Sequence, residues 1–475
     1  MKLNAHMFRG YDLRGVAGED LTPEIVLHLG KVYGTYLRRH GLTEALIACD
    51  SRATSPEYTT KIVEGLNWAG INTVNIGMTF VGVFYWAQYF LQKKGGVYIS
   101  ASHNPPEYNG FKFAIDYSET LVSEGIQEVR KMAEADDIEE GQTKGTNEDK
   151  NITPDYLADL QKRFDIKKKF KIVVDPSCAT GGAVVPPILR AFGMEVIESN
   201  CNVDPTFPVG TADPTETRVA QRVADKVKEV GADLGFSYDA DGDRLGIVDE
   251  NGGIIWNDVL LCLFAIDVLH YHPGAKVMFN TLCSKVVPET ITTNGGEPFM
   301  WRTGHSFLKK KNQEVKAAMI GELSGHFFFS ADFYNHDDSV FASLRVLNLL
   351  ARTGRKLSEI VAELPLYVSS PEVKLFCPDD SKVELTKKMI PTLKQDFPSA
   401  EIIDDERAGD GIRLELPDGM FVVRYSQNGP YITVKFEGKT KERYEELRKY
   451  IADLLKKFPE IDWHNKINVN HEALE

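Results

Sequence analysis

The chain has 475 residues, of which 43% are hydrophobic and 26% are charged, and its formal net charge is −14. This length exceeds what one hydrophobic core can serve and predicts about three or four domains of an ordinary globular protein. The acidic balance argues against nucleic acid as a partner and gives no reason to expect a membrane surface. No N-terminal signal or long apolar run is present, and the six cysteines form no C-x-x-C pair. We therefore expect a cytoplasmic protein in a reducing compartment.

The first 150 residues alternate predicted helices with short apolar strands. Thr22 and Pro23 suit the N-cap and the first position of a helix. Further strands are predicted at 45–49, 72–76 and 96–100, and further helices at 55–69, 82–91 and 123–135. Helices between strands predict right-handed βαβ units and a mostly parallel sheet. The acidic stretch 136–152 predicts the end of this domain.

A loop with chemical groups follows the last strand of this series. The run Ser100-Ala101-Ser102-His103-Asn104-Pro105-Pro106 continues neither a strand nor a helix, because two prolines fix φ and remove donors. A new strand starts at 111–113. A hydroxyl (Ser102), an imidazole (His103) and an amine (Lys112) are thereby held at a strand end, where open α/β sheets place their chemistry. The residues alone also allow a polar turn whose side chains bond the local backbone.

Two further α/β units of similar size follow in series, which indicates a structural repeat. The second unit is predicted from helix 153–163, strand 171–175, helix 182–192, strand 195–198, helix 215–230 and strand 233–238. The third unit is predicted from helix 258–270, strand 276–280, helix 285–293, strand 299–302, helix 306–316 and strand 318–321.

Three aspartates at alternate positions follow the last strand of the second unit, in Asp239-Ala240-Asp241-Gly242-Asp243-Arg244. Like charges this close repel one another, and a hard divalent cation with oxygen ligands relieves the repulsion. An EF-hand is a rival interpretation because Glu250 stands twelfth from Asp239, but the sixth position holds Arg244 instead of Gly and both flanks are predicted strands. A metal-free acidic turn is the other alternative.

Two more loops carry polar groups suited to a sugar phosphate. Gly321-Glu322-Leu323-Ser324-Gly325-His326 places a carboxylate, a hydroxyl and an imidazole just past a predicted strand, where they can bind adjacent sugar hydroxyls. Arg424-Tyr425-Ser426-Gln427-Asn428-Gly429-Pro430 combines an arginine, which forms a bidentate fork on phosphate, with hydroxyl, amide and backbone donors. Taken alone, the first loop is also compatible with a solvated turn and the second with a plain hairpin turn.

The chain changes character after Pro365. Strands near 372–376, 401–404, 411–416, 420–425 and 431–436, with helices at 381–396 and 440–457, predict an antiparallel α+β domain. Residues 459–475 are weakly patterned, and we expect them to trail along the surface or to remain mobile. The predicted fold is three consecutive α/β domains with mixed or parallel sheets (1–150, 151–254 and 255–367) and an α+β domain (368–475) around a central cleft.

Taken in order, these loops resemble the signature loops of the α-D-phosphohexomutases. Ser100–Pro105, with Gly110-Phe111-Lys112 shortly after, is similar to the active-site serine loop of that family. Asp239–Arg244 resembles its metal loop. Gly321–His326 resembles the sugar-binding loop of the phosphomannomutase/phosphoglucomutase branch.

Three weaker matches complete the series. Arg424–Pro430 resembles the family's phosphate loop R-x-S-N-T-x-P, but it reads Gln427-Asn428-Gly429 where Asn-Thr-x is expected. Tyr11–Gly15 resembles the N-terminal Y-D-I-R-G. Asp50-Ser51-Arg52 resembles the D-x-R after the next strand, where a structural salt bridge and a catalytic duty both stay open.

The resemblance implies a role for each matched residue. Ser102 would carry a transferable phosphoryl group, and an oxygen of that group would complete a Mg²⁺ shell formed by Asp239, Asp241 and Asp243. Arg244 would contact the phosphoryl group. Lys112, with a pKa lowered by Arg14 and the nearby metal, and His326 are the candidate bases. The other implied site residues are His103 and Arg14 for catalysis, and, for substrate, Tyr11, Lys285, Thr303, Gly304, His305, Glu322, Ser324, Arg424, Ser426, Gln427 and Asn428.

We therefore expect a phosphohexomutase that interconverts hexose 6-phosphate and hexose 1-phosphate, of mannose or glucose, through a phosphoserine enzyme. The expected cofactors are Mg²⁺ and a hexose 1,6-bisphosphate, which is the intermediate. The expected partners are small sugar phosphates, with no nucleic acid and no membrane, for a monomer or small homo-oligomer. A phosphoglucosamine mutase is the nearest alternative. A non-catalytic sugar-phosphate-binding protein is a remote one, because a binder has no use for a phosphorylatable serine.

Overall fold

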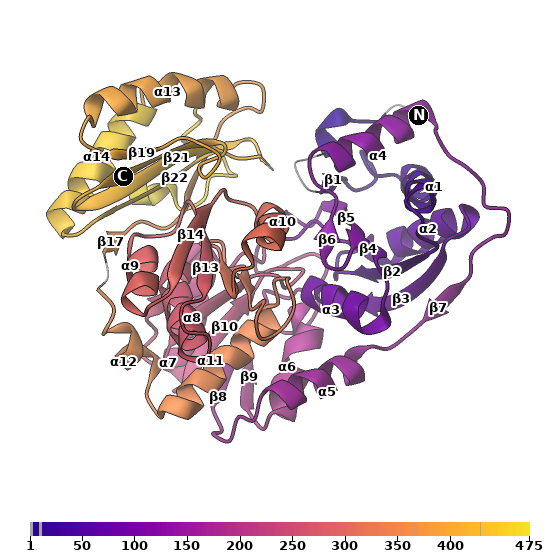
Figure 1. Ribbon diagram of the computed structural model, residues 1–475, viewed down its shortest axis with the longest axis horizontal. Helices are drawn as coiled ribbons and strands as arrows, with labels where there is room; N and C mark the ends of the chain where they lie inside the picture. Colours follow the sequence, from indigo (N-terminus) through magenta and orange to yellow (C-terminus); the bar gives the residue numbers. More distant parts are fainter. Residues whose placement is uncertain (1–2, 9–11, 366, 428) are drawn as a thin grey trace. The chain divides into compact units, whose positions relative to one another are not determined.

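The computed structural model describes residues 3–8, 12–365, 367–427 and 429–475, which form two compact units (Figure 1). Two predicted substrate residues, Tyr11 and Asn428, lie outside the described residues. Within the described ranges, no helix is both long and apolar enough to cross a membrane. The first unit comprises Met1–Pro214, Arg222–Gly253 and Tyr334–Gly354, and the second comprises Thr215–Gln221, Ile254–Phe333 and Arg355–Glu475.

The first unit begins with a mixed sheet in the strand order β1-β5-β4-β2-β3-β7. β4, β2 and β3 are parallel, whereas β5 runs antiparallel to both β4 and β1 because the chain turns straight back after the serine loop. Thr22 caps the first helix, as predicted. The elements are η1 (Ala5–Met7), β1 (Leu13–Val16), α1 (Pro23–Arg39), β2 (Glu44–Cys49), α2 (Ser55–Trp68), β3 (Asn72–Met78), α3 (Val81–Leu91), β4 (Gly95–Ile99), β5 (Tyr108–Asp116), β6 (Glu119–Thr120), α4 (Glu124–Ala135) and β7 (Asn147–Asp149).

Two further sheets repeat this arrangement, so the predicted repeat is present in the topology. β9, β8 and β10 are parallel with β11 antiparallel to β10, and β14, β13 and β15 are parallel with β16 antiparallel to β15. In all three sheets, one predicted loop joins the last parallel strand to the antiparallel one. The elements are α5 (Thr153–Arg163), β8 (Lys171–Asp175), α6 (Gly181–Ala191), β9 (Glu195–Glu198), α7 (Thr217–Val230), β10 (Leu234–Tyr238), β11 (Leu245–Asp249), β12 (Ile254–Ile255), α8 (Asn257–Tyr271), β13 (Lys276–Asn280), α9 (Val286–Thr293), β14 (Glu297–Trp301), α10 (His305–Val315), β15 (Met319–Gly321) and β16 (Phe327–Phe328).

The C-terminal sheet is antiparallel, in the order β17-β22-β21-β20-β19 with β18 also paired to β22. Helices α13 and α14 lie on one face of this sheet and share a core with it (Figure 1). The predicted α+β domain is confirmed. Its elements, with the helix before it, are α12 (Leu357–Val361), β17 (Val368–Ser369), β18 (Val373–Phe376), α13 (Lys382–Asp396), β19 (Glu401–Ile403), β20 (Gly411–Leu416), β21 (Gly419–Tyr425), β22 (Tyr431–Gly438), α14 (Lys441–Leu455) and η2 (His471–Leu474).

The prediction of a trailing or mobile C-terminal tail is wrong. Ile461 and Leu474 are buried in the core of the C-terminal sheet and its helices. The tail also pairs with β18 through isolated bridges of Asp462 and Val469. Two well-separated apolar anchors produce neither a helical nor a strand period, which is why the sequence pattern does not reveal them.

A buried helix of the first unit, α11 (Ser339–Thr353), is not among the predicted elements. Buried side chains occur at nearly every position of its first three turns, and its apolar residues, such as Val340, Leu344 and Leu347, keep a helical spacing that was a usable signal. Its N-cap is Asp338, whose carboxylate accepts the Phe341 N–H at 2.9 Å. The Tyr156 hydroxyl approaches both oxygens of this carboxylate, at 2.9 and 2.8 Å.

Asp338→Asn is expected to remove a pH dependence of stability. Burial raises the pKa of Asp338 to about 6 from its usual 3.8, against hydrogen bonds that lower it. The native carboxyl therefore keeps a proton that the unfolded chain releases, so the free energy of unfolding falls by on the order of 3 kcal/mol as pH rises from about 4 to about 6, and this contribution is constant above. Asparagine also caps helices. Urea titrations at several pH values across this range should show that the free energy of unfolding changes less with pH in the variant than in the wild type. Equal pH dependence of the two proteins would contradict the raised pKa given to Asp338.

Candidate active site

The serine loop leaves regular structure as soon as β4 ends. Ser102 is buried and has a φ of +48°, in the left-handed region that non-glycine residues rarely adopt. Its backbone N–H donates to the Ser100 hydroxyl at 2.8 Å. Backbone strain of this kind persists only where the surroundings enforce it, and it clusters at functional sites.

Arg52 supplies much of that enforcement. Its guanidinium is fully buried and pairs with Asp50 at 3.1 Å. It also donates to four backbone carbonyls of the serine loop, those of Ser102, Asn104 and Pro105 at 2.6 Å and that of Tyr108 at 2.9 Å. Burial lowers the pKa of Arg52, and Asp50 opposes the shift. The D-x-R match therefore has a structural role, which is to shape the loop that carries Ser102.

Arg14 reaches the same loop from β1. This strand pairs with β5, and Arg14 stands opposite Gly110. Its Nη1 donates to the Ala101 carbonyl at 3.2 Å and to the Asn104 side chain at 2.8 Å. An ion pair with Asp12 at 2.7 Å fixes the guanidinium. Arg14 thus contacts the serine loop, where the sequence predicts a catalytic role for it.

The aspartate loop joins β10 to β11 in a sharp turn. Gly242 has a φ of +67°, and a Cβ at this position would lie 2.1 Å from the Phe80 ring, so the turn requires glycine. The flanking strands exclude an EF-hand, which needs helices. Carboxylate oxygens of the three aspartates lie within 4.8 Å of one another, and all three residues are buried: Asp239, Asp241 and Asp243.

The two loops meet inside the first unit. The Ser102 hydroxyl donates to the Asp239 carboxylate at 2.8 Å and lies 3.1 Å from Nδ1 of His103. The Lys112 ammonium donates to the other two carboxylates, at 2.8 and 2.7 Å. Ser102 and Asp239 are 137 residues apart in the chain, yet the hydroxyl, the ammonium and the three carboxylates form one buried cluster.

Burial and mutual repulsion both disfavour the charged carboxylates of this cluster. Burial, followed by the charges of Asp243 and Asp241, raises the pKa of Asp239 well above its usual value. Burial lowers the pKa of Lys112, but the two carboxylates outweigh it and the net pKa is raised. The lowering expected from Arg14 and the metal stays a prediction for the site with a bound cation. Among the described residues, Asp241 Oδ1 is buried without a hydrogen-bond partner. A divalent cation with oxygen ligands fits this donor set.

Arg244 ends the aspartate loop and faces the same cluster. Its backbone N–H donates to Asp239 at 3.2 Å, and its guanidinium lies 3.7 Å from both Asp239 and Asp213. The Arg244 guanidinium is therefore held beside the Asp239 carboxylate, which also accepts the Ser102 hydroxyl. A guanidinium in this position is suited to a phosphoryl group on that hydroxyl.

In the second unit, two predicted sugar-binding segments come together. The Gly304 N–H donates to the Glu322 carboxylate at 2.8 Å. The imidazole rings of His305 and His326 stack, with centroids 4.8 Å apart and planes inclined by 6°. Ser324 lies half-buried in the same turn as Glu322. A carboxylate, a hydroxyl and two imidazoles are thus available here for polar ligand groups.

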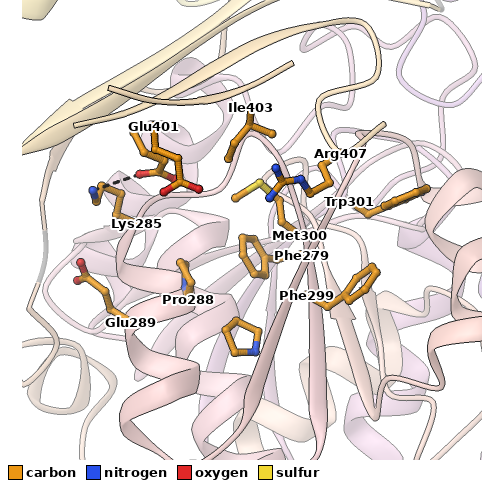
Figure 2. A pocket seen from close by; sticks show the side chains of 12 residues that line it. Phe279, Lys285, Pro288, Glu289, Phe299, Met300, Trp301, Glu401, Ile403 and Arg407 are labelled. Atoms are coloured by element: carbon orange, nitrogen blue, oxygen red, sulfur yellow. Dashed lines mark ion pairs between the residues drawn. The ribbon is translucent and has the colours of Figure 1, made fainter. Parts of the chain in front are cut away.

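Lys285 lines a separate pocket of about 620 Å³ (Figure 2). Its ammonium donates to the Leu416 carbonyl at 2.6 Å and pairs with Glu415 at 3.2 Å. The pocket walls are largely aromatic and aliphatic, with Phe279 and Trp301 among them. Lys285 is the one predicted site residue in this lining, so the pocket does not add to the evidence for the sugar site.

Arg424 is engaged by an internal partner. Its Nε donates to Asp410 at 2.8 Å, and its Nη2 donates to the second oxygen of the same carboxylate. Burial lowers the pKa of Arg424, but Asp410 outweighs it and the net pKa is raised. The Ser426 hydroxyl accepts the Gly429 N–H at 3.2 Å, and Gln427 is half-buried beside it. One edge of the fork predicted for phosphate is therefore used within the protein.

Two residues that organise these loops escaped the sequence prediction. Asn280 donates to the Thr303 hydroxyl at 3.2 Å and accepts the Leu323 N–H at 3.1 Å, so it ties the two sugar-binding segments together. Its place at the carboxyl end of β13 was a usable signal, because ligand sites gather there. Asp410 carried no such signal, because it lies in the turn before β20 and its partner Arg424 is on β21, 14 residues further along the chain.

Comparison with known proteins agrees with this geometry. Residues 5–140, 154–253 and 256–367 match alpha/beta/alpha domains I, II and III of phosphoglucomutase/phosphomannomutase. A phosphomannomutase/phosphoglucomutase of Pseudomonas aeruginosa is 35% identical over 96% of both chains, and a phosphoglucomutase of Neisseria meningitidis is 33% identical over 96% of this chain and 98% of its own. The crystal structure of a phosphoglucomutase/phosphomannomutase family protein from Burkholderia thailandensis matches with a TM-score of 0.87 at 31% identity, covering 96% of this chain and 98% of that one.

Fold, buried cluster and relatives together define an isomerase that transfers a phosphoryl group within its substrate, a phosphohexomutase. The predicted fold class and enzyme class are confirmed. More closely, the chain belongs to the phosphoglucomutase/phosphomannomutase family. The phosphoglucosamine mutase alternative is not favoured by these relatives.

Arg52→Ala is expected to destabilise the chain by about 3–5 kcal/mol, because it leaves the buried Asp50 carboxylate without its cation and removes the guanidinium donors from the carbonyls of the serine loop. Arg39→Ala is the matched control, since Arg39 pairs with Asp137 at 2.8 Å on the surface of the same unit. An exposed pair of this kind contributes at most about 1 kcal/mol. Urea unfolding of both variants measures the difference, and equal losses would refute the role given to Arg52.

Proposed function

We propose that this enzyme interconverts the 6-phosphates and 1-phosphates of mannose and glucose, with Ser102 as the phosphoryl carrier. One observation carries the proposal: the Ser102 hydroxyl donates to Asp239 at 2.8 Å within a cluster of three buried carboxylates. A phosphorylated serine brings nearly two further negative charges to this cluster. The cluster then needs cations on both sides of the ester, and Lys112 and Arg244 are in place to provide two of them.

The third cation in the proposal is Mg²⁺, held by Asp239, Asp241, Asp243 and an oxygen of the Ser102 phosphate. When bound, it neutralises charge that develops on the transferring group. Hard oxygen ligands and a substrate-like phosphate are the combination that Mg²⁺ prefers. The buried Asp241 Oδ1, which has no hydrogen-bond partner among the described residues, supports this choice.

In the first half of the proposed reaction, the phosphoryl group leaves Ser102 Oγ for a free hydroxyl of the hexose phosphate and gives a hexose 1,6-bisphosphate. The P–Oγ bond breaks while the new P–O bond forms, and the hydroxyl proton ends on Ser102 Oγ. His326 is proposed to take that proton from the sugar. Lys112, the other candidate, is paired with Asp241 and Asp243 and can act as a base only when a bound cation takes over those carboxylates. In the second half, the other phosphoryl group of the bisphosphate passes to Ser102 Oγ: its bond to the sugar oxygen breaks as the new P–Oγ bond forms, and the Ser102 proton ends on the released sugar hydroxyl. The Arg52 guanidinium, which binds the Ser102 carbonyl, keeps the backbone that carries Oγ in one position during both halves.

The sugar and its second phosphate are assigned to loops of the second unit. Glu322 and Ser324 are proposed to bind adjacent sugar hydroxyls, with Thr303, Gly304, His305 and Lys285 in the roles the resemblance implies. Arg424, Ser426, Gln427 and Asn428 are proposed to bind the phosphate that is not reacting. Support for both mannose and glucose comes from relatives that are named for both activities.

Coupled assays with mannose 1-phosphate, glucose 1-phosphate and glucosamine 1-phosphate test the substrate assignment. We expect kcat/KM for the first two to exceed that for the third by at least about tenfold, since contacts to one ring substituent give discrimination of this order. EDTA should abolish turnover, and excess Mg²⁺ should restore it. A preference for glucosamine 1-phosphate would instead point to a phosphoglucosamine mutase.

Ser102→Ala is expected to reduce kcat by at least about 10³-fold and to leave sugar-phosphate binding within about tenfold, because the variant loses the acceptor of the phosphoryl group. Phosphopeptide mass spectrometry of the wild-type chain, after incubation with glucose 1,6-bisphosphate, should find phosphate on Ser102. Ser399→Ala, at an exposed serine of the second unit, is the control and should keep full activity. A near-native rate in Ser102→Ala would defeat the assignment.

The remaining proposals concern partners and surroundings. We propose small sugar phosphates as the ligands of a monomer or small homo-oligomer. The cytoplasmic location and the four domain boundaries stay predictions. All six cysteines are buried with free thiols, which agrees with the reducing compartment expected from the sequence.

A further inference from the structure

The first turns of α11 hold the aspartate loop, although this helix carries none of the predicted site residues. The buried Ser339 hydroxyl donates to the carbonyl of Gly242 at 2.6 Å, across 97 residues of the chain. One turn further on, the Ser343 hydroxyl donates to the Ser339 carbonyl at 2.7 Å. Its single proton is thereby used, so the Tyr238 hydroxyl donates to it, at 2.8 Å. Tyr238 immediately precedes the loop, and α11 therefore holds the loop at two points.

The start of α3 holds the same loop from a second direction. The Val81 N–H, at the first position of this helix, donates to the Asp241 carbonyl at 2.9 Å. The Phe80 ring packs against Gly242 so closely that no side chain fits there. Two consecutive carbonyls, those of Asp241 and Gly242, are therefore fixed by donors from two helices. The peptides that carry them connect the carboxylates of the cluster.

We propose that Ser339 is a positioning residue for the cation site. Its hydrogen bond orients the peptide between Gly242 and Asp243, and so holds the Asp243 carboxylate in register with the other two. This inference rests on the proposed function, because it assumes that the three carboxylates bind a divalent cation. Groups that orient metal ligands from behind typically change metal affinity by about 10–100-fold when they are removed.

A purely structural role is the competing interpretation, and it makes a different prediction. If Ser339 only stabilises the start of α11, its loss lowers the melting temperature without changing the affinity of the folded chain for a cation. If it positions the loop, affinity falls in a chain that remains folded. The affinity for Mn²⁺, a probe that accepts the same oxygen ligands, separates the two.

Isothermal titration of the full-length chain with Mn²⁺ is the test. Ser339→Ala should raise the Kd by about 10–100-fold, while Ser339→Thr, which keeps the hydroxyl, should stay within about threefold of wild type. Thr353→Ala is the matched control, because its hydroxyl also donates to a carbonyl of α11, that of Leu349 at 2.9 Å, but at the other end of the helix. Melting curves in EDTA establish that each variant is folded. Ser339→Cys, whose thiol fills the site but donates weakly, should also weaken binding and replaces the alanine variant if that one does not fold.

The possible results distinguish the positioning role of Ser339 from the proposed cation site on which it rests. An unchanged Kd in the folded Ser339 variants, with saturable binding by the wild type, overturns the positioning role alone. Equal weakening by Thr353→Ala also overturns it, because the effect would then come from the helix as a whole. Absence of saturable Mn²⁺ binding by the wild type overturns the proposed cation site, and the positioning role with it.

Discussion

Three carboxylates held within 4.8 Å of one another in a buried site are the constraint on which the rest of the structure depends. Burial and their mutual repulsion raise the pKa of Asp239, and two neighbouring cations, Lys112 and Arg244, offset part of the negative charge of the cluster. A buried charge without a partner is strongly destabilising. The chain must therefore fix this cluster from several sides, which is the role of the carbonyl contacts from α3 and α11.

The repeated topology explains how three chemically different loops come to similar places in their sheets. In each α/β sheet the loop follows the last parallel strand and leads into an antiparallel partner. The carboxyl end of a parallel strand is where such sheets bind ligands. The antiparallel return keeps the loop short and anchors both of its ends, so that charged side chains are positioned by rigid elements. One supersecondary arrangement thus carries the proposed nucleophile, the proposed cation site and the proposed sugar-binding segment.

The sequence predicted features that lie within one continuous run of residues. Most of the features that it missed are contacts between residues far apart in the chain. The aspartate loop and the serine loop are continuous runs, so residue types and spacing identified them, and the capped helix after Thr22 was found for the same reason. The helix α11 is an exception, because it was missed although its apolar residues keep a helical spacing. The clamp made by Arg52 was open to two interpretations because its acceptors are backbone carbonyls, which have no sequence signature. The raised pKa of Lys112 could not be predicted from its own loop, since its carboxylate partners come from the aspartate loop.

Several buried arginines of this acidic chain bind groups of the protein itself. Arg52 binds carbonyls of the serine loop, and Arg413 binds the carbonyls of Thr281 and Cys283 at 2.5 and 2.6 Å, so both act on the protein itself. Arg424 is buried against Asp410 through one edge of its guanidinium. A guanidinium held in this way has lost most of its conformational freedom before any ligand arrives, and it loses little more when its free edge meets a phosphate. The internal carboxylate is therefore compatible with phosphate binding by Arg424, because it orients the fork that the sequence assigned to that anion.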